Sequence, residues 1–123
     1  RSNWILGVAG DAQHPPLRRM RELGCTVLLG TDNVMFIQSD MFAEMSFAYH
    51  VYRLDPRDLI RAAVLGSRLL FRSFFIEEGA PADFLLIRPA RSSLVFSADR
   101  CSTIVKRVTR CDIEKNVIST SCK

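Results

Sequence analysis

The most constraining feature of the sequence is a short, uninterrupted apolar run, Cys25–Leu29, which lies between a helical pattern and a polar segment. Strands that are buried on both faces of a parallel sheet are continuous apolar segments of about this length. The run ends at the polar segment Gly30–Asn33, and α/β folds place their chemistry at the carboxyl ends of such strands. The sequence therefore predicts an α/β fold with a buried strand over 25–29 and a functional cluster directly after it.

Helical patterns lie on both sides of this run. Pro15-Pro16 suits the first turn of a helix, and Gly24 is typical of the residue that follows the last turn. A second helix is predicted to begin after an N-cap at Ser39. One stripe of this second helix is expected to face the core, and it consists of Met41, Met45, Tyr49 and Tyr52.

A third helix is predicted to open at Asp55-Pro56, with Asp58 placed to cap it from the third position. Arginines define its solvent face, and small or apolar residues define its packing face. The arginines are Arg57, Arg61, Arg68 and Arg72, and the packing face holds Ala62, Ala63, Gly66 and Leu70.

The sequence changes in character after residue 75. Residues 76–81 predict a turn, because they combine acidic residues with Gly79 and Pro81. Four strands are then predicted, over Asp83–Ile87, Leu94–Phe96, Ile104–Val108 and Asn116–Ser119. Residues 1–75 are therefore predicted to be α/β, and residues 76–123 to be mostly β.

The composition is that of an ordinary globular chain. Of the 123 residues, 48% are hydrophobic and 24% are charged, which excludes a disordered tail, a collagen-like repeat and a coiled-coil rod. No apolar stretch approaches the ~20 residues that a membrane helix needs. The sequence opens at Arg1 without Met and without a charged-then-apolar leader, so we expect a trimmed start or a piece of a longer chain.

The cysteines match no metal-binding spacing, and they are Cys25, Cys101, Cys111 and Cys122. We interpret all four as reduced thiols of a cytoplasmic protein, with a disulfide as the alternative. Cys25 lies in the apolar run and is predicted to be buried.

The net charge of +4 comes partly from two basic groups. They consist of Arg18, Arg19 and Arg21, and of Lys106, Arg107 and Arg110. We expect a solvated surface here rather than a phosphate-binding patch, so neither nucleic acid nor a membrane is a predicted partner. A basic nucleic-acid binder remains a third, weaker hypothesis.

Several common catalytic motifs are missing from the sequence. It contains no phosphate-binding loop, no dinucleotide fingerprint, no HExxH and no GxSxG. His50 falls in the middle of a predicted helix and is expected to be structural, and His14 is expected in a solvated loop.

Asp32 is the strongest candidate for chemistry. A carboxylate directly after a buried strand can bind a metal ion, or take a proton from a metal-bound water. The alternative is that Asp32 bonds backbone amides and merely caps the next turn.

Six segments resemble the amidohydrolase superfamily, in its cytosine-deaminase and chlorohydrolase-like branch. Leu29–Asn33 resembles the "LGTD" signature, and Arg1–Asn3 resembles the end of "CPRSN". The other four are Pro15–Gly24 with "PP…LL..G", Met41–Met45 with "DMFEEM", Arg61–Ser67 with "ATxNGA", and Ile76–Phe84 with "IexGxxADlvviD". They occur in the family's order and near its spacing, from Arg1 to about Val117.

The resemblance implies a fold larger than this chain. The family combines a (β/α)8 barrel with a small β-sandwich built from both chain termini, and such a barrel alone needs about 250 residues. The chain would then be the C-terminal portion of a (β/α)8 metal-dependent hydrolase barrel, followed by part of the small β-sandwich domain. Residues 1–75 would carry the last barrel strand with its flanking helices, and residues 76–123 the C-terminal part of the sandwich.

The resemblance also implies a reaction. Asp32 would bind a divalent metal, Zn²⁺ or Fe²⁺, and carry a proton from metal-activated water to the leaving group, while Asn3 and Asn33 would lie near a small heterocyclic substrate. The family's His-x-His pair, its other metal histidines and its acid/base glutamate do not occur in this sequence. We therefore expect a deaminase-like amidohydrolase whose C-terminal part, taken alone, holds no catalytic metal and is inactive.

Besides the nucleic-acid binder, two stronger hypotheses remain open. In the first the chain belongs to such an enzyme, and in the second it is a non-catalytic α/β module that binds a partner or a small molecule. Under the first, Val27, Leu28 and Leu29 would lack neighbouring strands, and Met45 and Tyr49 would face water. Exposed apolar surface drives association, so we expect homo-oligomers or a companion chain that carries the missing N-terminal part.

Overall fold

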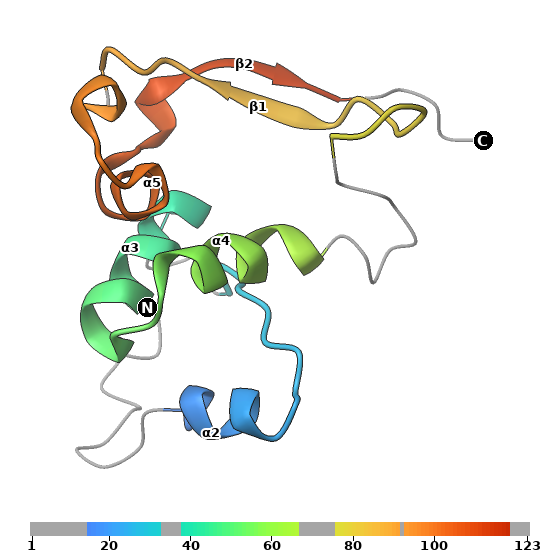
Figure 1. The fold of residues 1–123 in the computed structure, drawn as a ribbon, viewed down its shortest axis with the longest axis vertical. Coiled ribbons are helices and arrows are strands. Elements are labelled where there is room, and N and C mark those ends of the chain that lie inside the picture. The colour runs from blue at the N-terminus through green and yellow to red at the C-terminus, as the bar shows by residue number, and fades with distance from the viewer. Residues whose placement is uncertain (1–14, 33–37, 67–75, 92, 119–123) are drawn as a thin grey trace.

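A computed structural model describes residues 15–32, 38–66, 76–91 and 93–118 of the chain. Its elements are α2 (Leu17–Glu22), α3 (Met41–Tyr52), α4 (Pro56–Val64), β1 (Phe84–Ile87), the 3-10 helix η2 (Leu94–Phe96), α5 (Arg100–Arg107), the 3-10 helix η3 (Arg110–Asp112) and β2 (Ile113–Val117). Helices α3, α4 and α5 pack together, and β1 and β2 form a two-stranded ribbon along the top of the view (Figure 1).

The end of α2 is the Schellman turn that the glycine predicts. Gly24 adopts a left-handed conformation with φ 78°, and its N–H donates to the Arg21 carbonyl at 2.9 Å. The Cys25 N–H donates to the Met20 carbonyl, also at 2.9 Å. These two bonds satisfy carbonyls that the end of a helix otherwise leaves open, so the predicted helix stop at Gly24 is confirmed.

Replacing Gly24 by alanine is therefore expected to lower the free energy of unfolding by about 1 kcal/mol, because a side chain disfavours positive φ. An added Cβ would meet no atom within 4 Å, so the expected cost is conformational and not steric. Gly30→Ala is the matched control, since its Cβ also meets nothing within 4 Å and Gly30 does not have a positive φ. Urea denaturation measures both variants, and equal stability of the two would contradict the turn.

The apolar run over 25–29 does not form the predicted strand. Cys25 and Thr26 are exposed, and Val27–Leu29 are half-buried against α4, where the Leu29 N–H donates to the Ala62 carbonyl at 3.0 Å. A strand needs a neighbouring strand to satisfy its backbone, and none of the described residues forms one beside this run. The predictions of a doubly buried strand and of a buried Cys25 thiol are therefore wrong for this structure.

Helix α3 begins one residue later than predicted. Its N-cap is Asp40 and not Ser39, because the Asp40 carboxylate accepts the N–H groups of Phe42 at 3.0 Å and of Ala43 at 3.4 Å. The helix ends at Tyr52, and its C-cap Arg53 adopts a left-handed conformation with φ 54°.

Helix α4 begins where Asp55-Pro56 predicts, with the Asp55 carboxylate accepting the Arg57 N–H at 2.8 Å. Asp58 does not cap the helix but pairs with Arg21 at 2.7 Å and lies 3.9 Å from Arg61. Arg57 and Arg61 are exposed and Ala62 is buried, as the two predicted faces require. Arg68, Leu70 and Arg72 lie outside the described residues.

The antiparallel ribbon confirms two of the four strands predicted after residue 75. Strand β1 matches Asp83–Ile87 closely, whereas β2 begins at Ile113 and overlaps only the first part of Asn116–Ser119. The predicted turn at 76–81 is present, with Gly79 at φ 85° and the Ala80 N–H donating to the Glu77 carbonyl at 3.1 Å.

The other two predicted strands are helical. Leu94–Phe96 is the 3-10 helix η2, and Ile104–Val108 falls mostly within α5. The Asp99 carboxylate caps α5 by accepting the Ser102 N–H at 3.2 Å. Val105 of α5 and Val108, the residue directly after the helix, lie in the core, and Ile104 packs against it. Capping and tertiary packing therefore override the β-branched residues that suggested a strand.

Helix α5 completes the hydrophobic core. Leu59 of α4 is 1% exposed and Val105 of α5 is 0% exposed. The core consists of Phe42, Met45, Ala48, Leu54, Leu59, Val105 and Val108. Met45 is 5% exposed and Tyr49 is half-buried, so the expectation that both face water is wrong here.

The core therefore includes residues from both sides of the predicted boundary at residue 75. The barrel, the sandwich and the division between them stay predictions.

Candidate functional site

Asp32 lies at the end of the apolar run, where its side chain is exposed and its φ is 50°. Aspartate is one of the few residues besides glycine that enters this left-handed region readily. Asn3 and Asn33, the predicted substrate-binding residues, lie outside the described residues.

A pair of hydroxyl groups holds the backbone next to Asp32. The Oγ1 atom of Thr31 lies 3.1 Å from the Oγ atom of Ser39, so the two side chains share a hydrogen bond. This bond joins two positions eight residues apart, on either side of segment 32–38. Ser39 directly precedes the Asp40 cap, and the bond therefore anchors Thr31 to the beginning of α3.

A third residue, Arg110, contacts Ser39 from a position 71 residues later in the chain. Arg110 of η3 donates from its Nη1 atom to the Ser39 carbonyl at 3.4 Å. Asp112, which is 7% exposed, orders η3 by accepting from the Thr109 N–H at 2.8 Å and from its hydroxyl at 2.9 Å. The sequence places Arg110 in a basic group that is predicted to be solvated, and it does not predict this contact. The Thr109-x-x-Asp112 capping pattern was the available signal, although it indicates only the turn and not its target.

Asp32 by itself would supply one ligand to a metal ion. An exposed carboxylate is a ligand that Zn²⁺ or Fe²⁺ accepts, and a catalytic zinc usually needs three protein ligands. Among the described residues no group of three His, Cys, Asp or Glu side chains could hold a metal ion. Further ligands would have to come from outside the described ranges.

The structure describes one of the two histidines and three of the four cysteines, so it tests the predictions for these residues. His50 places its Nδ1 atom 2.8 Å from the Ser46 carbonyl and packs edge-on against Tyr49, so its structural interpretation is confirmed. Cys25, Cys101 and Cys111 are free thiols. His14 and Cys122 lie outside the described residues.

Many of the basic side chains already contact other groups. Arg19 pairs with Glu22 at 3.2 Å, and Arg21 pairs with Asp58. Lys106 places its ammonium 4.5 Å from the centre of the Tyr49 ring, which is a cation–π contact. These contacts favour a structural and solvated surface for both basic groups. That nucleic acid is not a partner stays a prediction.

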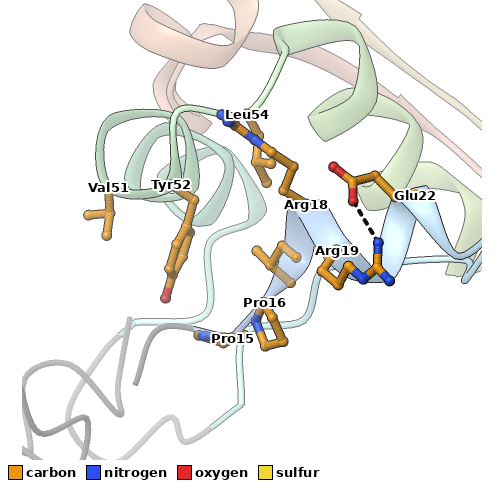
Figure 2. A pocket seen from close by; sticks show the side chains of 9 residues that line it. Pro15, Pro16, Arg18, Arg19, Glu22, Val51, Tyr52 and Leu54 are labelled. Atoms are coloured by element: carbon orange, nitrogen blue, oxygen red, sulfur yellow. Dashed lines mark hydrogen bonds and ion pairs between the residues drawn. The ribbon is translucent and has the colours of Figure 1, made fainter. Parts of the chain in front are cut away.

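One cleft, of about 480 Å³, opens between α2 and the end of α3 (Figure 2). Its walls include Pro15, Pro16, Val51, Tyr52 and Leu54, and the exposed Arg19–Glu22 pair lies at one side (Figure 2). A smaller cavity, of about 240 Å³, lies between the apolar run and α4. Asp32 lines neither space, so neither adds residues to the candidate site.

No helix in the described part of the chain is long and apolar enough to cross a lipid bilayer.

Two curated proteins are similar to this chain over most of its length. A protein of Methanothermobacter thermautotrophicus named "Putative aminohydrolase" is 36% identical over 110 residues, which is 85% of this chain and 26% of that protein. An uncharacterized protein of Methanocaldococcus jannaschii is 29% identical over 100 residues, which is 77% of this chain and 26% of that protein. No family model matches the sequence, and no solved structure matches it. The chain thus spans about a quarter of the length of each relative, one of which bears the name of an aminohydrolase.

Proposed function

We propose that this chain is the C-terminal portion of a metal-dependent amidohydrolase that removes an amino group from a nucleobase-like or other heterocyclic substrate. The similarity to a protein named "Putative aminohydrolase" over 85% of the chain is the observation that carries the proposal. The name of this relative is the basis for proposing hydrolysis at an amino group. The metal, the heterocycle and the barrel rest on the resemblance of the six sequence segments.

The position of Asp32 suits the role proposed for it. Its carboxylate is exposed at the end of an apolar run, where a substrate and a metal ion could reach it. A bound divalent metal would supply a water of lowered pKa, close to neutrality. Asp32 would hold the proton that this water loses and deliver it to the departing amine, so that a heterocyclic amine and water give a carbonyl compound and ammonia.

The natural protein that contains this chain tests the proposal. We expect it to release ammonia from some members of a panel of aminated pyrimidines, purines and triazines. Removing its metal with a chelator should lower the rate at least about a hundredfold, and Zn²⁺ or Fe²⁺ should restore it. Treatment with the chelator already saturated with metal is the control.

Two results would count against the proposal. One is an unchanged rate after metal analysis shows that the ion is gone. The other is the absence of ammonia from every heterocyclic amine, with the metal bound.

A further inference from the structure

Strand β1 carries apolar side chains on both of its faces. Its residues Phe84, Leu85 and Leu86 are 39%, 46% and 48% exposed, and successive residues of a strand point to opposite faces. The inner end of the ribbon packs against the core through Ile87 and Ile113, while the outer end extends away from the helices (Figure 1). A strand that is apolar on both faces is typical of the interior of a sheet and not of its edge.

Strand β2 has the opposite character. Its central residues Glu114, Lys115 and Asn116 are polar and exposed. The register of the two strands also shifts between Leu86 and Ile87, where β2 carries one extra residue. Charged side chains and bulges are features by which proteins protect the free edge of a sheet from further pairing. β2 therefore has the character of an edge strand, and β1 does not.

The backbone of β1 can accept a second neighbouring strand. The Arg88 N–H donates to the Asp112 carbonyl at 2.8 Å, so this N–H points toward the β2 side. The N–H groups alternate in direction along a strand of an antiparallel pair, so those of Leu85 and Ile87 point away from β2. Within the described residues, β2 is the one strand that lies beside β1. The opposite side of β1 is therefore an edge at which a further strand can form backbone hydrogen bonds.

We propose that β1 is an interior strand, and that a strand from the portion of the natural protein that precedes this chain pairs with its free edge. The two relatives contain enough additional chain for this segment, since the chain matches 26% of each. A two-stranded ribbon is at best marginally stable by itself, so its outer end needs such a neighbour. The inference rests on one part of the proposed function, namely that the chain is the C-terminal portion of a longer protein. It does not depend on a metal ion.

Amide hydrogen exchange of the natural protein, measured residue by residue, tests this pairing without any substitution. Leu85 and Asn116 are direct partners in the ribbon, and each turns its N–H away from the other strand. After correction for intrinsic rates, the Leu85 and Ile87 amides should exchange at least about 100-fold more slowly than the Asn116 amide. Similar exchange at Leu85 and Asn116 would overturn the proposal, whether both amides are fast or both are protected.

Photo-crosslinking identifies the neighbouring strand. The amino acid p-benzoylphenylalanine replaces Leu85 in one variant of the natural protein and Asn116 in the matched control, and mass spectrometry identifies the attached peptides. The probe at position 85 should attach to a peptide that precedes this chain, and the probe at position 116 should not. A mixture of ¹⁵N-labelled and unlabelled protein shows whether a cross-link joins two copies.

Cross-links from position 85 that reach only residues 1–123, or only a second copy, would overturn the proposal. If the variant at position 85 does not fold, hydrogen exchange of the unsubstituted protein still decides whether β1 is paired on its free side.

The outcomes separate this inference from the proposed function. A natural protein with a mass near 13.9 kDa would overturn both, because no chain would then precede Arg1. Protected amides at Leu85 and Ile87, together with no ammonia release from any heterocyclic amine, would support the inference and overturn the proposed reaction. Equal exchange at Leu85 and Asn116 in a metal-dependent deaminase would overturn the inference alone.

Discussion

The Asp32→Asn variant of the natural protein is expected to lose about 10²-fold to 10⁴-fold in kcat, the usual contribution of a positioned acid or base. Asparagine keeps the size and shape of the side chain but carries no charge and cannot hold the transferred proton. Its amide is also a poorer ligand for a divalent metal than a carboxylate, so the bound metal should fall together with the rate. Ammonia release and metal content, measured on the same preparation, check both effects.

Asp55→Asn is the matched control for this experiment, because it makes the same chemical change at another exposed aspartate. Asp55 caps α4 through the Arg57 N–H, and asparagine caps helices about as well as aspartate. This control should therefore keep its stability, its metal and its rate. Wild-type turnover in Asp32→Asn would show that Asp32 only shapes the turn after the apolar run.

The largest expected effect on stability comes from Leu59→Ala, which should lower the free energy of unfolding by about 2–5 kcal/mol. Leu59 is 1% exposed and lies in the core that α3, α4 and α5 share. Truncation removes its buried methyl groups and leaves a cavity that the surrounding helices fill only partly. The shift in the urea midpoint, with the slope of the transition unchanged, measures this loss.

Val64→Ala on the same helix is the matched control, because Val64 is 45% exposed. A surface substitution of this kind should stay within about 0.5 kcal/mol. Equal losses in the two variants would mean that α4 does not bury Leu59 against α5 in solution.

Helix boundaries were the most predictable part of the fold, because they depend on local chemistry. Asp55-Pro56 begins α4 and Gly24 ends the turn after α2, as the sequence predicts. The same local chemistry explains the one-residue error at α3, since Ser39 and Asp40 are both good caps and only the structure shows which side chain accepts the amides.

Where the secondary structure differs from the prediction, contacts between residues far apart in sequence determine it. Residues 104–108 are rich in β-branched side chains, yet 104–107 form the end of α5, a helix that Asp99 caps, and Val105 of this helix and Val108 directly after it both lie in the core. The apolar run 25–29 has the composition of a strand but has no described strand beside it. In both cases the secondary structure depends on contacts with residues far away in sequence, and a local sequence pattern does not show such contacts.

In the candidate site, too, a residue in a local pattern is predictable from sequence, and a residue that arrives through a long-range contact is not. Asp32 could be singled out from sequence, because a carboxylate after an apolar run is a local pattern. Arg110 could not, because its contact with Ser39 joins positions 71 residues apart. Whether Asn3 and Asn33 lie near Asp32 stays a prediction, since both are outside the described residues.

The closing of the core by α5 has a consequence for how the chain is made. Synthesis proceeds from the N-terminus at about 5–20 residues per second, so α3 and α4 are made before Val105. Until α5 arrives, Met45 and Leu59 lack the surface that buries them in the finished molecule. The nascent chain therefore spends about a few seconds with the apolar faces of α3 and α4 not yet covered by α5, a state that is prone to aggregate.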